Sequence, residues 1–82
     1  MDYSFTKHAE KQLRGFPEEI QRFIIKKLKF YLSTPDPMHY ADAIEGERGK
    51  VYRFRTGDYR LIFVWEKNRV LVTKVSIRPR AY

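Results

Sequence analysis

The sequence predicts an α+β domain of two layers, in which an N-terminal strand and a two-helix hairpin pack on an antiparallel β-meander. Three observations support this prediction. Apolar residues recur at helical spacing in the first half of the chain, whereas the second half alternates apolar and polar residues. A Pro-Asp-Pro turn at 35–37 separates the two patterns. Hydrophobic residues make up 43% of the 82 residues, which is enough for the core of one domain spanning 1–82.

The first elements are expected to be a strand and a helix. Residues 2–5 alternate polar and aromatic side chains, as a short edge strand does. Thr6 is a good N-cap for a helix that extends to Arg14. Gly15 follows near the C′ position, where glycine is favoured, and therefore ends this helix.

A second, longer helix is predicted to begin at Pro17, with carboxylates in its first turn that complement the helix dipole. Its apolar stripe continues at spacings of three and four residues as far as Leu32. The helix is expected to end at Ser33, before the Pro-containing turn. Residues 38–49 are expected to form a loop.

Three strands are predicted over residues 51–55, 59–65 and 69–77. Gly57 suits the position of a two-residue turn that requires a positive φ, and this turn pairs Arg55 with Arg60 and Phe54 with Leu61. The register places the apolar side chains of the first hairpin on one face and the arginines on the other.

For the second turn we expect a three-residue loop, residues 66–68, because Asn68 tolerates the left-handed conformation. A two-residue loop would direct Lys74 and Arg78 into the core, which is costly for charged groups. With the longer loop, Arg60 faces Lys74, and Ser76 and Arg78 lie on the same side.

The positive charge is concentrated in the predicted sheet. Residues 50–82 carry nine basic and two acidic side chains, whereas the two kinds are equal in number over 1–49, so the C-terminal part carries the whole net charge of +7. Like charges opposite one another on a sheet are destabilising, and an anionic ligand would relieve them. A rigid cationic surface predicts a phosphate-rich partner.

Composition argues against several other classes of protein. The chain has no Cys and only two His, so neither a disulfide nor a convincing metal site is expected, and no cofactor is indicated. No apolar run approaches the roughly 20 residues that span a membrane, and the N-terminus lacks the apolar region of a signal peptide. We therefore expect a cytoplasmic protein without a membrane partner.

These residues resemble the RelE/ParE superfamily of toxins from type II toxin–antitoxin pairs. The resemblance begins with Phe5, Ala9 and Leu13 and the Phe16-Pro17 link. It is strongest over residues 51–63, VYRFRTGDYRLIF, and closes on residues 75–82, VSIRPRAY. The resemblance implies an acidic, partly disordered antitoxin as partner.

Two activities occur in this superfamily. RelE-like members are ribosome-dependent endoribonucleases that cut mRNA in the ribosomal A site, and ParE-like members inhibit DNA gyrase. The RelE-like interpretation, with ribosome and mRNA as partners, is preferred because the motif positions are basic or tyrosine. The catalytic residues that it implies are Arg53, Arg55, Arg60, Arg78 and Tyr82. Further RNA contacts are expected from Lys50, Lys74, Arg80, Lys26, Lys27 and Lys29. A gyrase inhibitor and an inactive RNA-binding member are the alternatives.

The expected chemistry is attack by the RNA's own 2′-OH on the adjacent phosphorus. Arginine forks bind phosphate oxygens in pairs and stay charged, so Arg60 and Arg78 are expected to stabilise the developing charge. Tyr82 is expected to stack on a base or to hydrogen-bond the 2′-OH. The proton acceptor stays open between Tyr82, ribosomal groups and the loop carboxylates Glu45 and Glu47, because arginine does not accept a proton.

Overall fold

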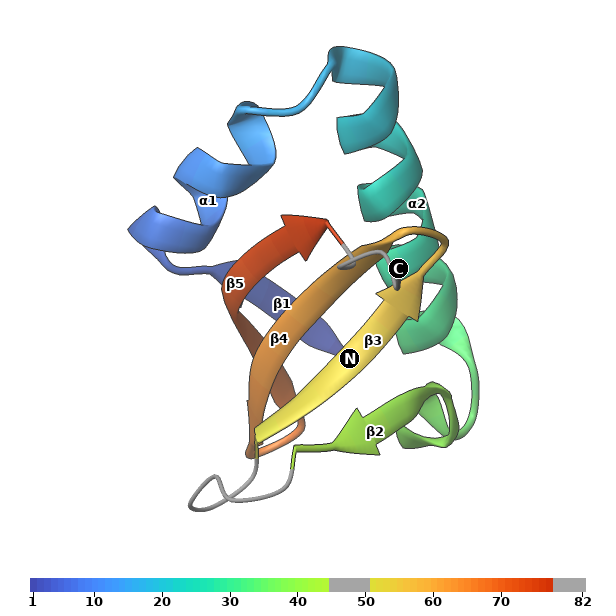
Figure 1. Ribbon diagram of the computed structural model, residues 1–82. Coiled ribbons are helices and arrows are strands. Elements are labelled where there is room, and N and C mark those ends of the chain that lie inside the picture. Colours follow the sequence, from blue (N-terminus) through green and yellow to red (C-terminus); the bar gives the residue numbers. More distant parts are fainter. Residues whose placement is uncertain (45–50, 78–82) are drawn as a thin grey trace.

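The computed structural model describes residues 1–44 and 51–77. In chain order its elements are β1 (Asp2–Phe5), α1 (Lys7–Arg14), α2 (Glu18–Ser33), the 3-10 helix η1 (Pro37–Tyr40), β2 (Ala41–Ala43), β3 (Val51–Thr56), β4 (Tyr59–Glu66) and β5 (Arg69–Ile77). The strands form one twisted sheet in the order β1-β5-β4-β3-β2 (Figure 1). β1 runs parallel to β5, and every other neighbouring pair is antiparallel. The predicted α+β class and two-layer arrangement are confirmed.

The helices begin where the sequence predicts. The Thr6 hydroxyl caps α1 by accepting a hydrogen bond of 3.1 Å from the backbone N–H of Ala9. Gly15 ends α1 with a right-handed φ of −73°, so the left-handed freedom of glycine is not used there. The Gln21 amide, on α2, donates to the Phe16 carbonyl at 2.8 Å and fixes the link between the two helices.

The core lies between α2 and the inner face of the sheet. The fully buried apolar side chains of the sheet are Phe54, Leu61, Phe63, Val70 and Val72, with Val75 almost fully buried. α2 contributes Ile24, Leu28, Tyr31 and Leu32, whereas Phe23 of the predicted stripe stays 38% exposed. Burying one such side chain contributes about 1.5–3 kcal/mol, so this layer accounts for much of the stability.

The β3–β4 hairpin matches its prediction. Arg55 pairs with Arg60 and Phe54 with Leu61 across a two-residue turn. Gly57 has a φ of 65°, which an L-residue rarely adopts. A Cβ placed at Gly57 would lie 3.3 Å from Cε2 of Phe23, so the close approach of α2 also favours glycine.

The predicted three-residue loop at the second turn is wrong. Glu66 pairs with Arg69, and the two residues between them, Lys67 and Asn68, have φ values of 50° and 58°, the pattern of a type I′ turn. A tight turn is compatible with an outward Lys74 because the register shifts between Ile62 and Phe63.

The register shift is a β-bulge at Thr73. Phe63 pairs with Val72 and Ile62 with Lys74, which leaves Thr73 as the extra residue. The predicted pairing of Arg60 with Lys74 is therefore also wrong, because Arg60 pairs with Ser76. One extra residue reverses the alternation of side chains, so Lys74 and Ser76 still lie on the same face as Arg60.

Part of the expected loop at 38–49 is ordered structure. η1 covers Pro37–Tyr40, and β2 pairs with β3 so that Ala41 faces Phe54 and Asp42 faces Arg53. The meander is therefore extended by a fourth strand, and with β1 the sheet has five. Residues 45–49 of the expected loop lie outside the described residues.

Candidate functional site

The outer face of the sheet, opposite α2, displays two adjacent rows of side chains. One row contains Asp42, Arg53, Ile62 and Lys74, on β2, β3, β4 and β5. The neighbouring row contains Arg55, Arg60 and Ser76, about 7 Å further along the strands. We call the side chains of Arg53, Arg55, Arg60 and Lys74 the basic face.

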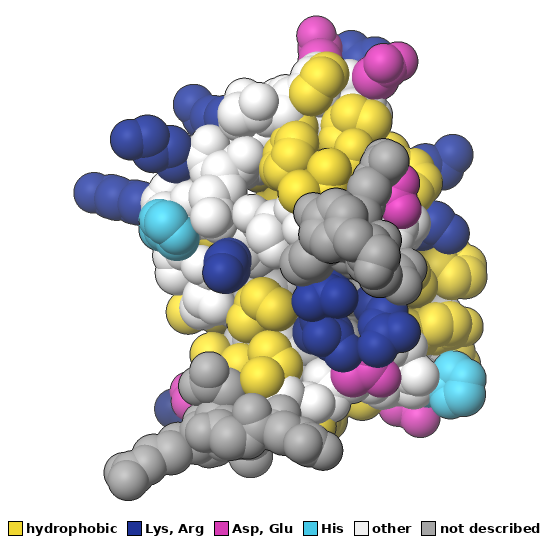
Figure 2. Space-filling view, viewed as in Figure 1, with side chains coloured by type: hydrophobic (Ala, Val, Ile, Leu, Met, Phe, Trp, Pro, Cys, Tyr) yellow, Lys and Arg dark blue, Asp and Glu magenta, His cyan; other side chains and the backbone are white. Residues whose placement is uncertain are grey.

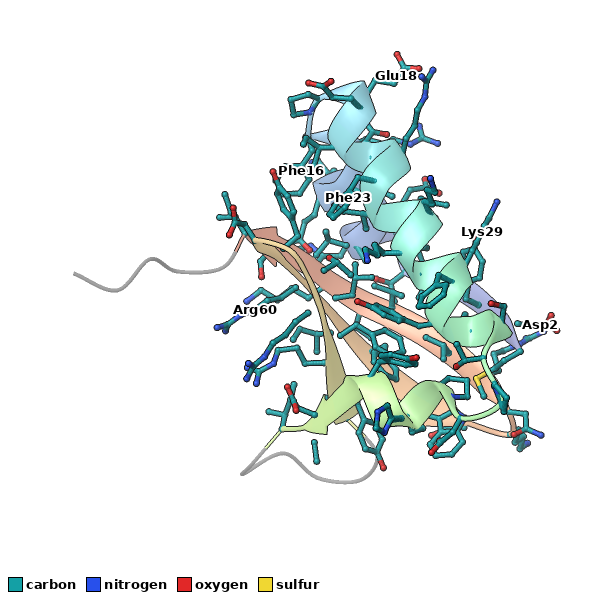
Figure 3. All side chains as sticks on the ribbon, turned by 90° about the vertical axis from the view of Figure 1, so that its right-hand side faces the viewer. Asp2, Phe16, Glu18, Phe23, Lys29 and Arg60 are labelled. Carbon is teal, nitrogen blue, oxygen red and sulfur yellow. The ribbon has the colours of Figure 1, made fainter. Side chains whose placement is uncertain are left out.

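The basic face points away from the helical layer. Figure 3 shows Arg60 on the side of the sheet opposite α2. Figure 2 shows basic side chains gathered at one place on the surface, with acidic atoms against them. Three neighbouring strands therefore hold this charge on a rigid support, as the sequence predicts for Arg53, Arg55, Arg60 and Lys74.

The arginines differ in burial. The side chain of Arg53 is 22% exposed, whereas that of Arg55 is 62% exposed. The Nε atoms of Arg53 and Arg60 are buried and have no hydrogen-bond partner within the described ranges. Buried donors normally have an acceptor. These two N–H groups are therefore buried donors without an acceptor among the described residues.

Asp42 lies against the basic face and was not predicted to do so. Its Oδ2 is 3.1 Å from Nε of Arg55 and 3.4 Å from Nη2 of Arg53. No sequence pattern indicated this contact, because Asp42 falls in a segment predicted as loop. Only the pairing of β2 with β3 brings its carboxylate to the arginines.

The helical lysines are not brought to the basic face. Lys26, Lys27 and Lys29 lie on α2, in the other layer, and Nζ of Lys27 is 6.0 Å from the ring centroid of Phe30. The predicted site residues Lys50, Arg78, Arg80 and Tyr82 lie outside the described residues, as do Glu45 and Glu47.

Neither histidine lies on the basic face. His8 is exposed on α1, and His39 is exposed in η1, with its ring 5.2 Å from that of Tyr40. In the part of the chain that the structure describes, no three metal-ligating side chains come together. Within residues 1–44 and 51–77, no helix is long and apolar enough to cross a membrane.

Tyr31 connects the core to the basic face. Its hydroxyl donates a hydrogen bond of 3.0 Å to the backbone carbonyl of Arg55. Burial, and secondarily the neighbouring Tyr40, raises the pKa of Tyr31 above its usual value of 10.0. The phenol therefore stays protonated and keeps its hydrogen bond to the carbonyl of Arg55 on β3.

No family model and no curated protein sequence matches this chain. Three solved structures are similar to it. The first is the RelBE2 toxin–antitoxin complex of Mycobacterium tuberculosis, at 23% identity and a TM-score of 0.81, over 94% of this chain and 96% of that one. The second is the isolated RelE toxin of E. coli, at 23% identity and a TM-score of 0.75, over 98% and 86%. The third is the archaeal RelE–RelB complex of Pyrococcus horikoshii, at 26% identity and a TM-score of 0.73, over 98% and 97%.

These likenesses extend over nearly the whole of each chain. The chain has the fold of the RelE toxins. The resemblance predicted from residues 51–63 is therefore confirmed at the level of the fold.

Proposed function

We propose that this chain, which has the RelE toxin fold, is the toxin of a type II toxin–antitoxin pair, with residues 1–82 as a single toxin domain. We propose further that it is a ribosome-dependent endoribonuclease that cuts mRNA in the A site and inhibits translation. The observation that carries this proposal is the basic face. Arg53, Arg55, Arg60 and Lys74 present their charges together from three adjacent strands.

The reaction proposed is an internal transfer at phosphorus. The 2′-oxygen of the RNA forms a bond to the adjacent phosphorus, and the bond from phosphorus to the 5′-oxygen breaks. The products are a 2′,3′-cyclic phosphate and a 5′-OH, with one proton lost from the 2′-OH and one gained by the leaving oxygen. Guanidinium groups can hold both non-bridging oxygens as negative charge develops on them. The lack of an ion pair for Arg60 within residues 1–44 and 51–77 supports giving it this role.

The absence of histidine from the described part of this face suggests why a ribosome would be required. Arginine remains charged at every working pH and does not accept a proton. Most of the rate enhancement must then come from holding the 2′-OH in line with the leaving oxygen. A ribosome that holds the mRNA provides this alignment. Tyr82 and ribosomal groups are the proposed participants in proton transfer.

The proposed protein partner is an antitoxin with an acidic segment that folds across the basic face. Two of the three similar structures named above are complexes of a RelE-type toxin with its antitoxin. An acidic segment would neutralise the repulsion between Arg55 and Arg60, which face each other directly. It would also cover the surface proposed to bind mRNA.

The test compares substitutions at two ends of the same outer face. Arg60→Ala is expected to lower cleavage of ribosome-bound mRNA about 10²–10³-fold, as loss of a charge-stabilising donor does. Arg60→Lys should also lose much of the activity, because a point charge does not replace the bidentate fork. The control is Arg69→Ala, which removes the same charge at the end of β5 that pairs with Asp2. Figure 3 places Asp2 at the end of the molecule opposite Arg60.

The measurement is the 5′-OH fragment from mRNA on ribosomes with an open A site, together with translation and DNA supercoiling after induced expression. Cleavage by Arg60→Ala equal to that of Arg69→Ala would contradict the assignment of the face. Rapid cleavage of naked RNA would indicate an ordinary ribonuclease. Intact mRNA with blocked gyrase in arrested cells would indicate the ParE-like activity.

A further inference from the structure

Asp42 makes an unusual contact with the basic face. A single carboxylate oxygen, Oδ2, touches the guanidinium groups of both Arg53 and Arg55. These arginines are two residues apart on β3 and point to the same face, so one oxygen bridges two forks. A bridging anionic oxygen of this kind is also what a phosphate offers to a pair of arginines.

The carboxylate is accessible and not locked in the core. The side chain of Asp42 is 49% exposed, and Arg55 beside it is 62% exposed. Exposed ion pairs contribute little to stability, so an incoming anion can displace this one at small cost. Asp42 lies on β2, at the edge of the sheet, and the register opposite Arg53 holds it in place.

The ion pairs divide the basic face into two parts. Arg53 and Arg55 share the Asp42 carboxylate. Arg60 and Lys74 have no ion pair among residues 1–44 and 51–77. One part of the face is therefore partly neutralised by the protein itself, with one carboxylate for two guanidinium groups. The other part has no acidic partner in those ranges and keeps its full charge.

We infer that Asp42 is a resident competitor of phosphate, which occupies the place of a phosphate oxygen between Arg53 and Arg55 and must be displaced when RNA binds. A polynucleotide can place one phosphate at Arg60 and Lys74 while the next displaces the carboxylate, and the first contact raises the local concentration of the second phosphate. A single free anion lacks this assistance. Asp42 thus favours RNA over free phosphate at the face whose function is proposed above.

The experiment uses Asp42→Asn, which keeps the shape of the side chain and removes its charge. The matched control is Asp2→Asn, which changes the net charge equally at the end of the molecule opposite Arg60 (Figure 3). The probes are a ten-nucleotide single-stranded RNA and inorganic phosphate, titrated over a range of salt concentrations. Asp42→Thr, which favours a strand, provides a second variant if the amide weakens β2.

Asp42→Asn is expected to bind the RNA about two- to fivefold more tightly than the wild type. This is the change in affinity that corresponds to the free energy of one exposed ion pair. Its plot of log affinity against log salt should be steeper by up to about 0.7, because one more cation is free to neutralise phosphate. Inorganic phosphate that binds between Arg53 and Arg55 should gain more affinity than RNA, because it lacks the contact at Arg60 and Lys74 that helps RNA to displace the carboxylate. Asp2→Asn should match the wild type in all of these measurements.

Equal affinities of Asp42→Asn and Asp2→Asn would overturn the inference. Weaker binding by Asp42→Asn would also overturn it, since Asp42 would then orient the arginines and not compete for them. Failure of Asp42→Asn to bind either probe would count against it equally. This experiment measures binding of RNA and phosphate, whereas the test of the proposed function measures cleavage. A failed cleavage test would therefore overturn the proposed function without changing the difference in binding expected between Asp42→Asn and Asp2→Asn.

Discussion

At the scale of single residues, Tyr31 shows how the core supports the basic face. Its ring stacks on Phe54, with centroids 4.9 Å apart, and its hydroxyl donates to the carbonyl of Arg55. One side chain of α2 thus contacts both the inner face of β3 and the backbone of a site residue. Loss of the phenolic proton would remove this hydrogen bond.

We predict that Tyr31→Phe lowers the free energy of unfolding by about 0.5–1.5 kcal/mol at pH 7, the usual value of one hydrogen bond. Because the pKa of Tyr31 is raised in the folded state, its contribution is complete below pH 10.0 and is lost as pH rises through the folded value. The variant should therefore lose less stability than the wild type as pH rises above 10.0.

Urea unfolding at several pH values measures this effect. Tyr3→Phe is the control, because the Tyr3 hydroxyl makes no hydrogen bond within the described part of the chain. Parallel pH curves for the wild type and Tyr31→Phe would show that the phenol plays no part in alkaline destabilisation.

At the scale of elements, the bulge in β5 decides which side chains reach the basic face. β1 covers the edge of β5 only as far as Val72. Beyond it, the N–H of Val75 donates to the side-chain carbonyl of Gln12 on α1, at 2.7 Å. α1 thus satisfies the strand edge where β1 ends, and it holds the register that directs Lys74 outward.

We predict that Gln12→Leu destabilises the protein by about 1–3 kcal/mol, because the N–H of Val75 loses its acceptor in a partly buried site. Gln12→Glu keeps an acceptor oxygen and should lose less. Hydrogen exchange of the Val75 amide, with thermal unfolding of both variants, checks the prediction. Equal protection of this amide in Gln12→Leu and the wild type would contradict it.

At the scale of the whole molecule, the two faces of the sheet separate stability from function. Neighbours in β4 illustrate this, because Leu61 is fully buried against the helices while Arg60 belongs to the basic face. Arg60 also faces Arg55, so its repulsion opposes folding. Removing Arg60 should therefore cost little stability.

We predict that Leu61→Ala or Phe54→Ala lowers the free energy of unfolding by about 2–5 kcal/mol through a core cavity. Arg60→Ala should remain as stable as the wild type or become slightly more stable. Denaturant unfolding of the three variants, alongside their activity per folded molecule, measures both effects. An unfolded Arg60→Ala protein would show that the outer face is needed for folding.

The sequence alone determined the helices, the three long strands and the β3–β4 register. These depend on local signals, namely the apolar stripe of α2, alternation in the strands and Gly57 at a turn with positive φ. The same alternation placed Arg53, Arg55 and Arg60 on one face, because side chains in a strand point alternately to opposite sides.

Only the tertiary structure decided the second turn, β2 and the position of Asp42. The bulge at Thr73 lets a tight turn coexist with an outward Lys74. Next to the bulge, the amide of Val75 donates to Gln12, which is 63 residues away in sequence. The three-residue strand β2 has little strand propensity of its own and forms because β3 offers it an edge. Contacts between distant segments, which no local pattern encodes, therefore bring the carboxylate of Asp42 to the arginines.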